Sequence, residues 1–329
     1  MLFTAKALTL VVAALLLISG AALVARRGRR AGDRGHLEVT DWNEETNALS
    51  EALDTAMTEP GQRRALRKAA RKLRKSAAAT AQPRRRVFVL DFLGDLQASG
   101  VDALRHEVTA VLARAGADDE VVVRVESAGG LVHGYGLAAS QLSRVANARV
   151  RLTVCVDKVA ASGGYLMACV ADQILAAPFA VLGSIGVVAQ IPNIHRLLKR
   201  HDIDVELLTA GEYKRTLTVL GENTEAGRQK FQRDLEAIHA LFKRHVAERR
   251  TRLDVEAVAT GEIWLGTDAL AKGLVDHIRT SDEYLAELAA EGAKIYQVAY
   301  RPVQSWRERL GLTGLLAAIR RALSRPLPV

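Results

Sequence analysis

The sequence predicts an α/β fold in which βαβ units build a mostly parallel sheet. After residue 86, short apolar runs alternate with segments of helical periodicity, at a spacing typical of βαβ units. The apolar runs lack a regular polar–apolar alternation, which favours strands covered by helices on both faces. With 49% hydrophobic and 25% charged residues, the chain has an ordinary globular composition, so we do not expect extensive disorder.

Each expected element can be assigned from its residues. In chain order these are the strand VFVLDF, a helix from about Val101 to Ala115, the strand EVVVRVES, a helix from about Gly134 to Val145, the strand VRLTVCV, and a helix that begins near Ser162. Prolines and glycines divide the apolar stretch 174–194, which therefore predicts buried strands and turns instead of a membrane span. A long amphipathic helix, TEAGRQKFQRDLEAIHALFKRHVAERR, follows.

The first 30 residues predict a membrane anchor. The run ALTLVVAALLLISGAALV, residues 7–24, carries no charge and is long enough to span a hydrocarbon core of ~30 Å as a helix. A cleaved signal peptide is the alternative, but the run exceeds a usual signal-peptide core, and Arg26 and Arg27 stand where a cleavage site would be expected. We therefore expect an uncleaved anchor in the inner (plasma) membrane.

The net charge of +9 lies entirely in the first part of the chain. Residues 1–86 hold 17 Lys and Arg against 8 Asp and Glu, whereas residues 87–329 hold 29 of each kind. Residues 31–60 are acidic and polar, and GQRRALRKAARKLRK then gives a helix with a broad cationic surface and a stripe of Leu66, Ala69 and Leu73. Residues 63–75 could be a solvated linker or could contact anionic lipid. Nucleic acid is not expected, because no aromatic residues are interleaved.

Ser162 is the candidate nucleophile. It stands at a strand-to-helix turn before Gly163 and Gly164, where backbone N–H groups can stabilise an oxyanion. The alternative is that Ser162 only caps the helix. A second glycine pair, Gly129 and Gly130, also follows a strand, so both loops are expected at the same edge of the sheet, where they could form an oxyanion hole.

The general base is not evident from local sequence. His133 would suit a Ser-His arrangement, with Asp157 or Asp172 as its orienting carboxylate. A lysine can serve instead if burial lowers its pKa enough to leave a neutral amine. Lys214, in LLTAGEYKRTLT, follows an apolar strand and a glycine turn. Two weaker lysine candidates lie in a strand-end turn and a charged helix: Lys158 and Lys199.

Four ordered motifs, ESAGG, DKVAASGGYLMACVAD, GSIGVV and AGEYKRTLT, resemble the S49 peptidase family. The resemblance is to its signal peptide peptidase A group, most closely to the SohB-type members, and covers about residues 86–290. It implies a ClpP/crotonase-like spiral of βαβ units, preceded here by the N-terminal transmembrane helix. It also implies a catalytic dyad of a serine and a distant lysine.

The resemblance assigns roles to individual residues. Ser162 matches the nucleophile, Lys214 the general base, and Ser184 the serine that orients the lysine. The oxyanion hole would be formed by backbone N–H groups of the first glycine loop and of the serine motif: Gly129, Gly130 and Gly163. Where the family usually has proline, this chain has Ala128, which loosens the loop but removes no donor.

We therefore expect a membrane-anchored serine endopeptidase that acts on membrane-associated or unfolded polypeptides or signal-peptide remnants. The expected parts are an anchor with its basic flank (1–30), a polar then basic linker (31–86), a peptidase domain (87–300) and a basic and apolar tail (301–329). The resemblance implies a closed homo-oligomer, with neither metal nor cofactor. The alternatives are a crotonase-like acyl-CoA enzyme and a catalytically silent membrane scaffold.

The charges that flank the anchor bear on which side of the membrane holds the peptidase domain. Four arginines, the last of them Arg29 and Arg30, follow the apolar run, and only Lys6 precedes it. The positive-inside rule therefore favours a cytoplasmic domain. The resemblance favours the outer face, because signal peptide peptidase A proteins are generally taken to act there. Both placements stay open, and the charge pattern slightly favours the cytoplasmic one.

Overall fold

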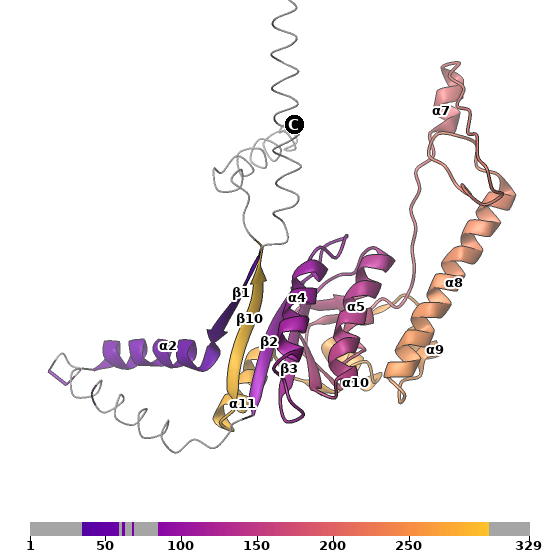
Figure 1. Ribbon diagram of the computed structural model, residues 1–329. Coiled ribbons are helices and arrows are strands. Elements are labelled where there is room, and N and C mark those ends of the chain that lie inside the picture. Colours follow the sequence, from indigo (N-terminus) through magenta and orange to yellow (C-terminus); the bar gives the residue numbers. More distant parts are fainter. Residues whose placement is uncertain (1–34, 59–60, 63–67, 69–84, 303–329) are drawn as a thin grey trace, which may run out of the picture. The chain divides into compact units, whose positions relative to one another are not determined.

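A computed structural model describes residues 35–58, 61–62, 68 and 85–302 (Figure 1). It forms two compact units, Met1–Glu38 with Ala299–Val329 and Val39–Val298. The helices and strands are β1 (His36–Asp41), α2 (Trp42–Met57), β2 (Arg86–Leu93), α4 (Val101–Leu112), β3 (Glu120–Glu126), α5 (Val132–Asn147), β4 (Arg151–Val156), β5 (Val159–Ala161), α6 (Gly163–Ala168), β6 (Gln173–Ala176), β7 (Val181–Gly183), α7 (His195–Arg200), α8 (Glu225–Arg249), α9 (Val255–Val258), β8 (Ile263–Leu265), α10 (Gly266–Ala271), β9 (His277–Ile278), α11 (Ser281–Ala290) and β10 (Lys294–Arg301).

The larger unit is built on a parallel sheet, which confirms the predicted α/β class. Its strands follow the order β10-β2-β3-β4-β6-β9, and all five neighbouring pairs are parallel. A second sheet has the order β5-β7-β8, in which β5 and β7 are parallel and β7 and β8 antiparallel. The two sheets meet where Ser127, just after β3, bridges to Ala160 of β5.

Both faces of the parallel sheet are covered, as the unalternating strands predict. On β2, Phe88, Leu90 and Phe92 belong to one core cluster and Val87 and Val89 to the other. The first cluster packs the sheet against α4 and α5, which Figure 1 shows side by side, and the second packs it against α11. This double cover holds the strand ends, and the loops that follow them, in fixed positions.

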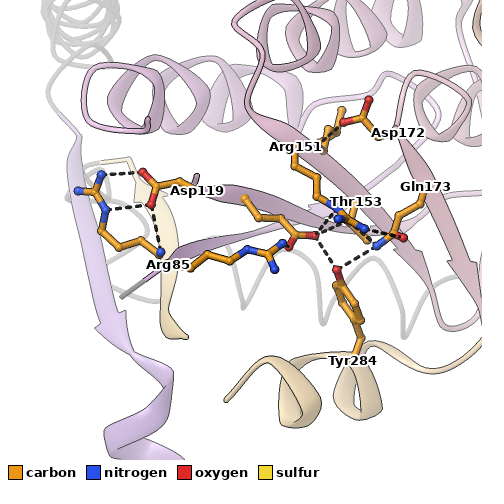
Figure 2. A network of polar contacts seen from close by, with 10 residues as sticks. Arg85, Asp119, Arg151, Thr153, Asp172, Gln173 and Tyr284 are labelled. Carbon is orange, nitrogen blue, oxygen red and sulfur yellow. Dashed lines mark hydrogen bonds and ion pairs between the residues drawn. The ribbon is translucent and has the colours of Figure 1, made fainter. Parts of the chain in front are cut away.

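A buried polar network joins the strands β3, β4 and β6 to the helix α11 (Figure 2). Glu120 is fully buried, accepts a hydrogen bond from Tyr284 Oη (2.8 Å) and another from Thr153 Oγ1, and pairs with Arg85. Gln173 Nε2 donates to Thr153 Oγ1 (3.0 Å) and Tyr284 Oη (2.9 Å). Burial, followed by the charge of Glu120, raises the pKa of Tyr284 to about 12.

The stretch 174–194 is only partly as predicted. It forms β6 and β7 with a turn between them, and most of its apolar side chains as far as Ile185 are buried, although Phe179 in the turn is 82% exposed. Beyond that point the prediction of burial is wrong, because Val188 is 90% exposed and residues 189–194 are exposed as well. The second half of this stretch therefore leaves apolar surface exposed, most of all at Val188.

The long predicted helix is confirmed as α8, which begins at the N-cap Thr224. Thr224 Oγ1 accepts a hydrogen bond from the N–H of Gly227 (3.1 Å). Only Phe242 and Val246, in its C-terminal half, are buried against the core. Figure 1 shows α7 beyond the N-terminal end of α8, at the end away from α9. We call residues 187–224, which include α7, the arm.

In the smaller unit, the described residues are 35–38 and 299–302, in which β1 and β10 are neighbouring strands. The N–H of Gly35 donates to Tyr300 Oη (2.8 Å), and Arg301 Nε donates to Glu38 (2.8 Å). The expected anchor at residues 7–24 and most of the tail 301–329 lie outside the described residues. No helix in the part that the structure describes is both long and apolar enough to cross a membrane.

Candidate active site

Ser162 occupies a tight turn between β5 and α6. Its φ of 52° and ψ of −117° lie in a region that non-glycine residues rarely adopt and that persists only where the surroundings enforce it. Here the N–H of Ser162 donates to Gly183 O (2.8 Å), and its carbonyl accepts from Leu166 N (2.9 Å). Ser162 stands at the N-cap position of α6, but its side chain makes no capping hydrogen bond to the helix.

The first glycine loop lies directly against this turn, as expected, although the two loops follow strands of different sheets that meet at the bridge between Ser127 and Ala160. Gly129 has a φ of +93°, and a Cβ built on it would stand 2.6 Å from Ser162 Cβ and 2.8 Å from the nitrogen of Gly163. Only glycine fits such an approach. The N–H of Gly129 donates to Ser127 Oγ (3.0 Å), which leaves Gly130 and Gly163 as the better candidates for oxyanion donors.

Ser127 and Tyr135, which the sequence did not single out, buttress this loop. Ser127 Oγ and Tyr135 Oη are 2.5 Å apart, and Tyr135 Oη donates to Asp95 O (2.8 Å). Burial raises the pKa of the Tyr135 hydroxyl, which keeps it neutral and able to donate. The ring of Tyr135 also fills the space beside Gly163, where an added Cβ would lie 2.3 Å from the ring. This contact explains the need for glycine after Ser162.

Ser184 lies beside Ser162 because β7 pairs with β5 in the small sheet. It too has a positive φ, 51°, and its N–H donates to Glu262 O (2.6 Å). Ser162, Ser184 and the glycine residues 129, 130 and 163 all line one cavity of about 990 Å³. The structure therefore brings together five of the six site residues expected from the sequence.

Lys214 is the sixth, and in this structure it is not among the residues that line the cavity. It is exposed on the arm between α7 and α8, where its N–H donates to Gly211 O (3.1 Å). The neighbouring Tyr213 is also exposed, at 55%, and Lys230 lies over its ring at 5.4 Å. The lysine and the serine thus belong to different parts of the larger unit.

The other bases considered are not at the cavity either. His133 is exposed at the start of α5, and its two candidate orienting carboxylates are engaged elsewhere. Asp157 accepts from the N–H (2.8 Å) and hydroxyl (2.6 Å) of Ser281, and Asp172 accepts from Leu152 N (2.8 Å). The weaker lysines are in ion pairs, Lys158 with Glu126 and Lys199 with Asp204.

Helix α8 lines another side of the cavity with apolar and polar side chains, among them two histidines that sequence reasoning missed. Leu235 and Phe242 line the cavity together with His239 and His245. His239 Nε2 lies 3.2 Å from Ile185 O, and burial lowers the pKa of His245. Their helical spacing with Phe242 was the available signal, because it places both histidines on the apolar stripe of the helix.

Several known proteins are similar to this chain. The sequence profile described as "Peptidase family S49" matches residues 145–295, and that described as "Peptidase family S49 N-terminal" matches residues 1–142. A protein of Haemophilus influenzae named "Probable protease SohB" is 49% identical over 301 residues, which are 88% of this chain and 85% of that protein. A Buchnera aphidicola protein of the same name is 58% identical over 202 residues, 61% of this chain and 60% of its own length.

More distant similarities are also found. "Protease 4" of Salmonella typhi is 31% identical over 182 residues, which are 54% of this chain and 29% of that protein. Among solved structures, an alanine mutant of the 1510-N membrane-bound stomatin-specific protease aligns with a TM-score of 0.43 and 12% identity. That alignment covers 63% of this chain and 86% of the other.

Proposed function

The chain belongs to peptidase family S49, and on this premise we propose that it is a membrane-anchored serine endopeptidase with a Ser162–Lys214 dyad. One observation carries the proposal most strongly. Ser162 is held at a positive φ, in contact with a glycine loop and at the wall of a large cavity, which is the arrangement that an exposed nucleophile needs. Further support comes from relatives that are named as proteases.

In the proposed reaction, Ser162 Oγ attacks the carbonyl carbon of the scissile peptide bond while the neutral amine of Lys214 takes the hydroxyl proton. The N–H groups of Gly130 and Gly163 hold the oxyanion of the tetrahedral intermediate. Lys214 then gives the proton to the leaving amine, and an acyl-enzyme remains on Ser162. A water molecule that the same lysine deprotonates hydrolyses this ester. No metal or cofactor takes part in any step.

Ser184 is the proposed orienting group for the lysine. It lines the cavity together with Ser162, so an amine between the two hydroxyls could donate to one and accept from the other. Lys214 lies outside the cavity in this structure, so the arm that carries it must come closer to a Ser162 for the dyad to form. We propose that the protein forms a closed homo-oligomer in which the arm of one copy carries Lys214 to the Ser162 of its neighbour. Exposed apolar side chains along the arm, such as Val188 and Leu208, support a contact of this kind.

The lining of the cavity suits a polypeptide substrate with apolar side chains. Leu166, Leu235 and Phe242 line it, together with polar side chains that include Ser162 and Ser184. Membrane-associated or unfolded polypeptides, including signal-peptide remnants, would present such side chains in an extended form. The family membership favours this function over the acyl-CoA enzyme, which would leave Ser162 without a role. We also propose that the larger unit has the ClpP/crotonase-like spiral, for which the parallel sheet gives support.

Residues 7–24 are the proposed anchor in the inner membrane, with residues 63–75 in contact with anionic lipid headgroups. The charge asymmetry around the anchor favours a cytoplasmic peptidase domain. Alkaline phosphatase folds only in an oxidising compartment, so its fusion after Val329 should stay inactive while a fluorescent cytoplasmic reporter at the same site is bright. Strong phosphatase activity would place the domain on the outer side instead.

A fluorophosphonate probe, which reacts only with activated serines, tests the proposed function. The full chain should be labelled at Ser162, and Ser162→Ala should abolish labelling. An acyl-CoA enzyme or a silent scaffold should not be labelled at all. Lys214→Ala should also abolish labelling. Lys158→Ala is its matched control and should stay labelled, because it removes a lysine that is paired with Glu126 and lies outside the cavity.

A further inference from the structure

His245 of α8 has one ring nitrogen that the described part of the chain leaves without a hydrogen-bond partner. This atom, Nε2, is buried and makes no hydrogen bond to any of the described residues. The side chain lines the same cavity as Ser162. A buried polar atom that stays unpaired destabilises a fold, so native proteins rarely keep one without a use. The nitrogen is therefore a candidate for contact with whatever enters the cavity.

The other ring nitrogen is engaged at the end of helix α6. Leu166 belongs to the last turn of this helix, where carbonyl groups have no partner within the helix. Its backbone hydrogen-bonds the ring of His245, and its carbonyl also accepts from Cys169 Sγ (3.3 Å). Since a carbonyl can only accept, the bonded nitrogen, Nδ1, carries the ring proton. In a neutral imidazole, Nε2 is then an acceptor.

The surroundings of His245 keep its imidazole neutral. Burial lowers the pKa of His245 below its ordinary value of 6.5, and the charge of Arg249 lowers the pKa further. The Leu166 backbone and the charge of Glu248 oppose this shift without reversing it. At neutral pH, Nε2 therefore offers a lone pair, and its complement is a ligand group that donates a hydrogen bond.

Apolar side chains accompany His245 in the lining of the cavity. Leu166 of α6 and Phe242 of α8 both line it, and Phe242 precedes His245 by one turn on the same helix face. The other histidine of α8 is different, because His239 Nε2 lies 3.2 Å from Ile185 O. A ligand side chain beside His245 would thus meet apolar groups and one free acceptor.

His245 also lies close enough to the nucleophile to contact a residue next to the cleaved bond. Leu166 N donates to Ser162 O (2.9 Å), so Leu166 stands one turn of α6 after Ser162. One helical turn rises about 5.4 Å, which is less than the length of two residues in an extended peptide. Because Leu166 holds the ring of His245, the free nitrogen is in the neighbourhood of the scissile bond.

We infer that His245 determines specificity in a side-chain subsite of the cavity, where Nε2 accepts a hydrogen bond from a hydroxyl-bearing substrate residue such as tyrosine or threonine. This inference rests on the proposed peptidase function and specifies part of its substrate preference. Phenylalanine or valine would contact the apolar groups but leave Nε2 unpaired. A cationic side chain would meet the charge of Arg249, and an amide would bury a carbonyl oxygen beside apolar groups.

Peptide binding to the full chain with Ser162→Ala tests the subsite without hydrolysis. The probes are two pairs of fluorescent, otherwise apolar ten-residue peptides, with a central tyrosine or phenylalanine in one pair and a central threonine or valine in the other. Fluorescence anisotropy gives the Kd of each peptide, and circular dichroism verifies that each variant is folded. Ser162→Gly serves as a second inactive chain, because glycine readily adopts the positive φ of this position.

The hydroxyl-bearing peptide of each pair should bind at least about fivefold more tightly, as expected for one hydrogen bond. This preference should vanish in His245→Leu and in His245→Met, a second apolar replacement with a more adaptable side chain. It should return in part in His245→Gln, whose amide oxygen can accept near the position of Nε2. His133→Leu is the matched control and should keep the preference, because His133 is exposed and does not line the cavity.

Equal Kd values within both peptide pairs would overturn the inference, and so would a preference that survives His245→Leu. Fluorophosphonate labelling of the unmutated chain separates this result from the proposed function. Labelling at Ser162 without any hydroxyl preference would contradict the subsite alone. A hydroxyl preference without labelling would contradict the peptidase function and leave His245 as part of a peptide-binding site.

Discussion

At the scale of single residues, the backbone conformations of Ser162 and Gly129 determine the geometry of the candidate site. Ser162 and Ser184 both have positive φ values, and each N–H is held by a carbonyl of a neighbouring strand or loop. Gly129, also at positive φ, lies so close that only a hydrogen atom fits between its Cα and Ser162. The rigid small sheet supplies the restraints that keep these unusual conformations.

The first prediction concerns Gly129→Ala. The new methyl group would collide with Ser162 Cβ and Gly163 N and would have to displace the nucleophile or the oxyanion loop. Because a displacement of about 1 Å can cost about 10²-fold in rate, we expect peptidase activity on casein to fall by at least that factor. Gly116→Ala is the matched control, since its nearest neighbour is at 3.7 Å and its φ is not positive. Full activity in Gly129→Ala would show that this loop is not part of the site.

A second prediction concerns Tyr135, whose hydroxyl bridges Ser127 and Asp95 O. Tyr135→Phe keeps the ring beside Gly163 but removes both hydrogen bonds, which should cost about 1–3 kcal/mol of unfolding free energy. Because Ser127 also holds Gly129, kcat should fall more than KM changes. Urea unfolding and steady-state kinetics would measure the two effects. An unchanged kcat would mean that the Ser127–Tyr135 contact serves folding alone.

At the scale of elements, the sequence predicted the strands and helices that have strong apolar periodicity. The predicted adjacency of the two glycine loops is confirmed, because Ser127, just after β3, bridges to Ala160 of β5 and Gly129 lies against Ser162. The role of α8 as a cavity wall was not predicted. Packing between a helix and a loop distant in sequence leaves no local pattern, and the histidines on its apolar stripe were the only trace.

The network around Glu120 gives a prediction at the same scale. The pKa of Tyr284 is raised in the folded protein, from an ordinary value of 10.0 to about 12, so its neutral form is favoured by folding. The stability that this provides is fully present below pH 10 and is lost as the pH rises from about 10 to about 12. In Tyr284→Phe, stability at neutral pH should be lower, and the decline between pH 10 and pH 12 should be shallower. Thermal unfolding across this range would measure both, and parallel profiles for the two proteins would contradict the role of Tyr284.

At the scale of the whole molecule, the separation of Lys214 from Ser162 is the main feature that sequence could not supply. A motif resemblance names residues, but it does not say whether they meet within one chain or between chains. Here Ser162 lies at the cavity, directly after a strand of the small sheet. Lys214 lies on the exposed arm. The membrane anchor stays a prediction, because residues 7–24 lie outside the part that the structure describes.

The proposed assembly predicts complementation between two inactive variants. Chains with Ser162→Ala and chains with Lys214→Ala should each be inactive as homo-oligomers. When they are co-expressed, neighbouring copies can join an intact serine to an intact lysine, so activity should return. Light scattering should show an assembly larger than a monomer in every case. If mixed assemblies form and stay inactive, the lysine reaches the serine of its own chain.

The central claim is that Ser162 is a nucleophile that Lys214 activates. Fluorophosphonate labelling of the full chain, with casein hydrolysis measured in parallel, tests it most directly. We expect Ser162→Ala, Lys214→Ala and the double variant to lose labelling and hydrolysis to the same extent, because residues that act as a unit are not additive. His133→Ala should retain most of both activities. Labelling at Ser162 that persists undiminished in Lys214→Ala would contradict the claim.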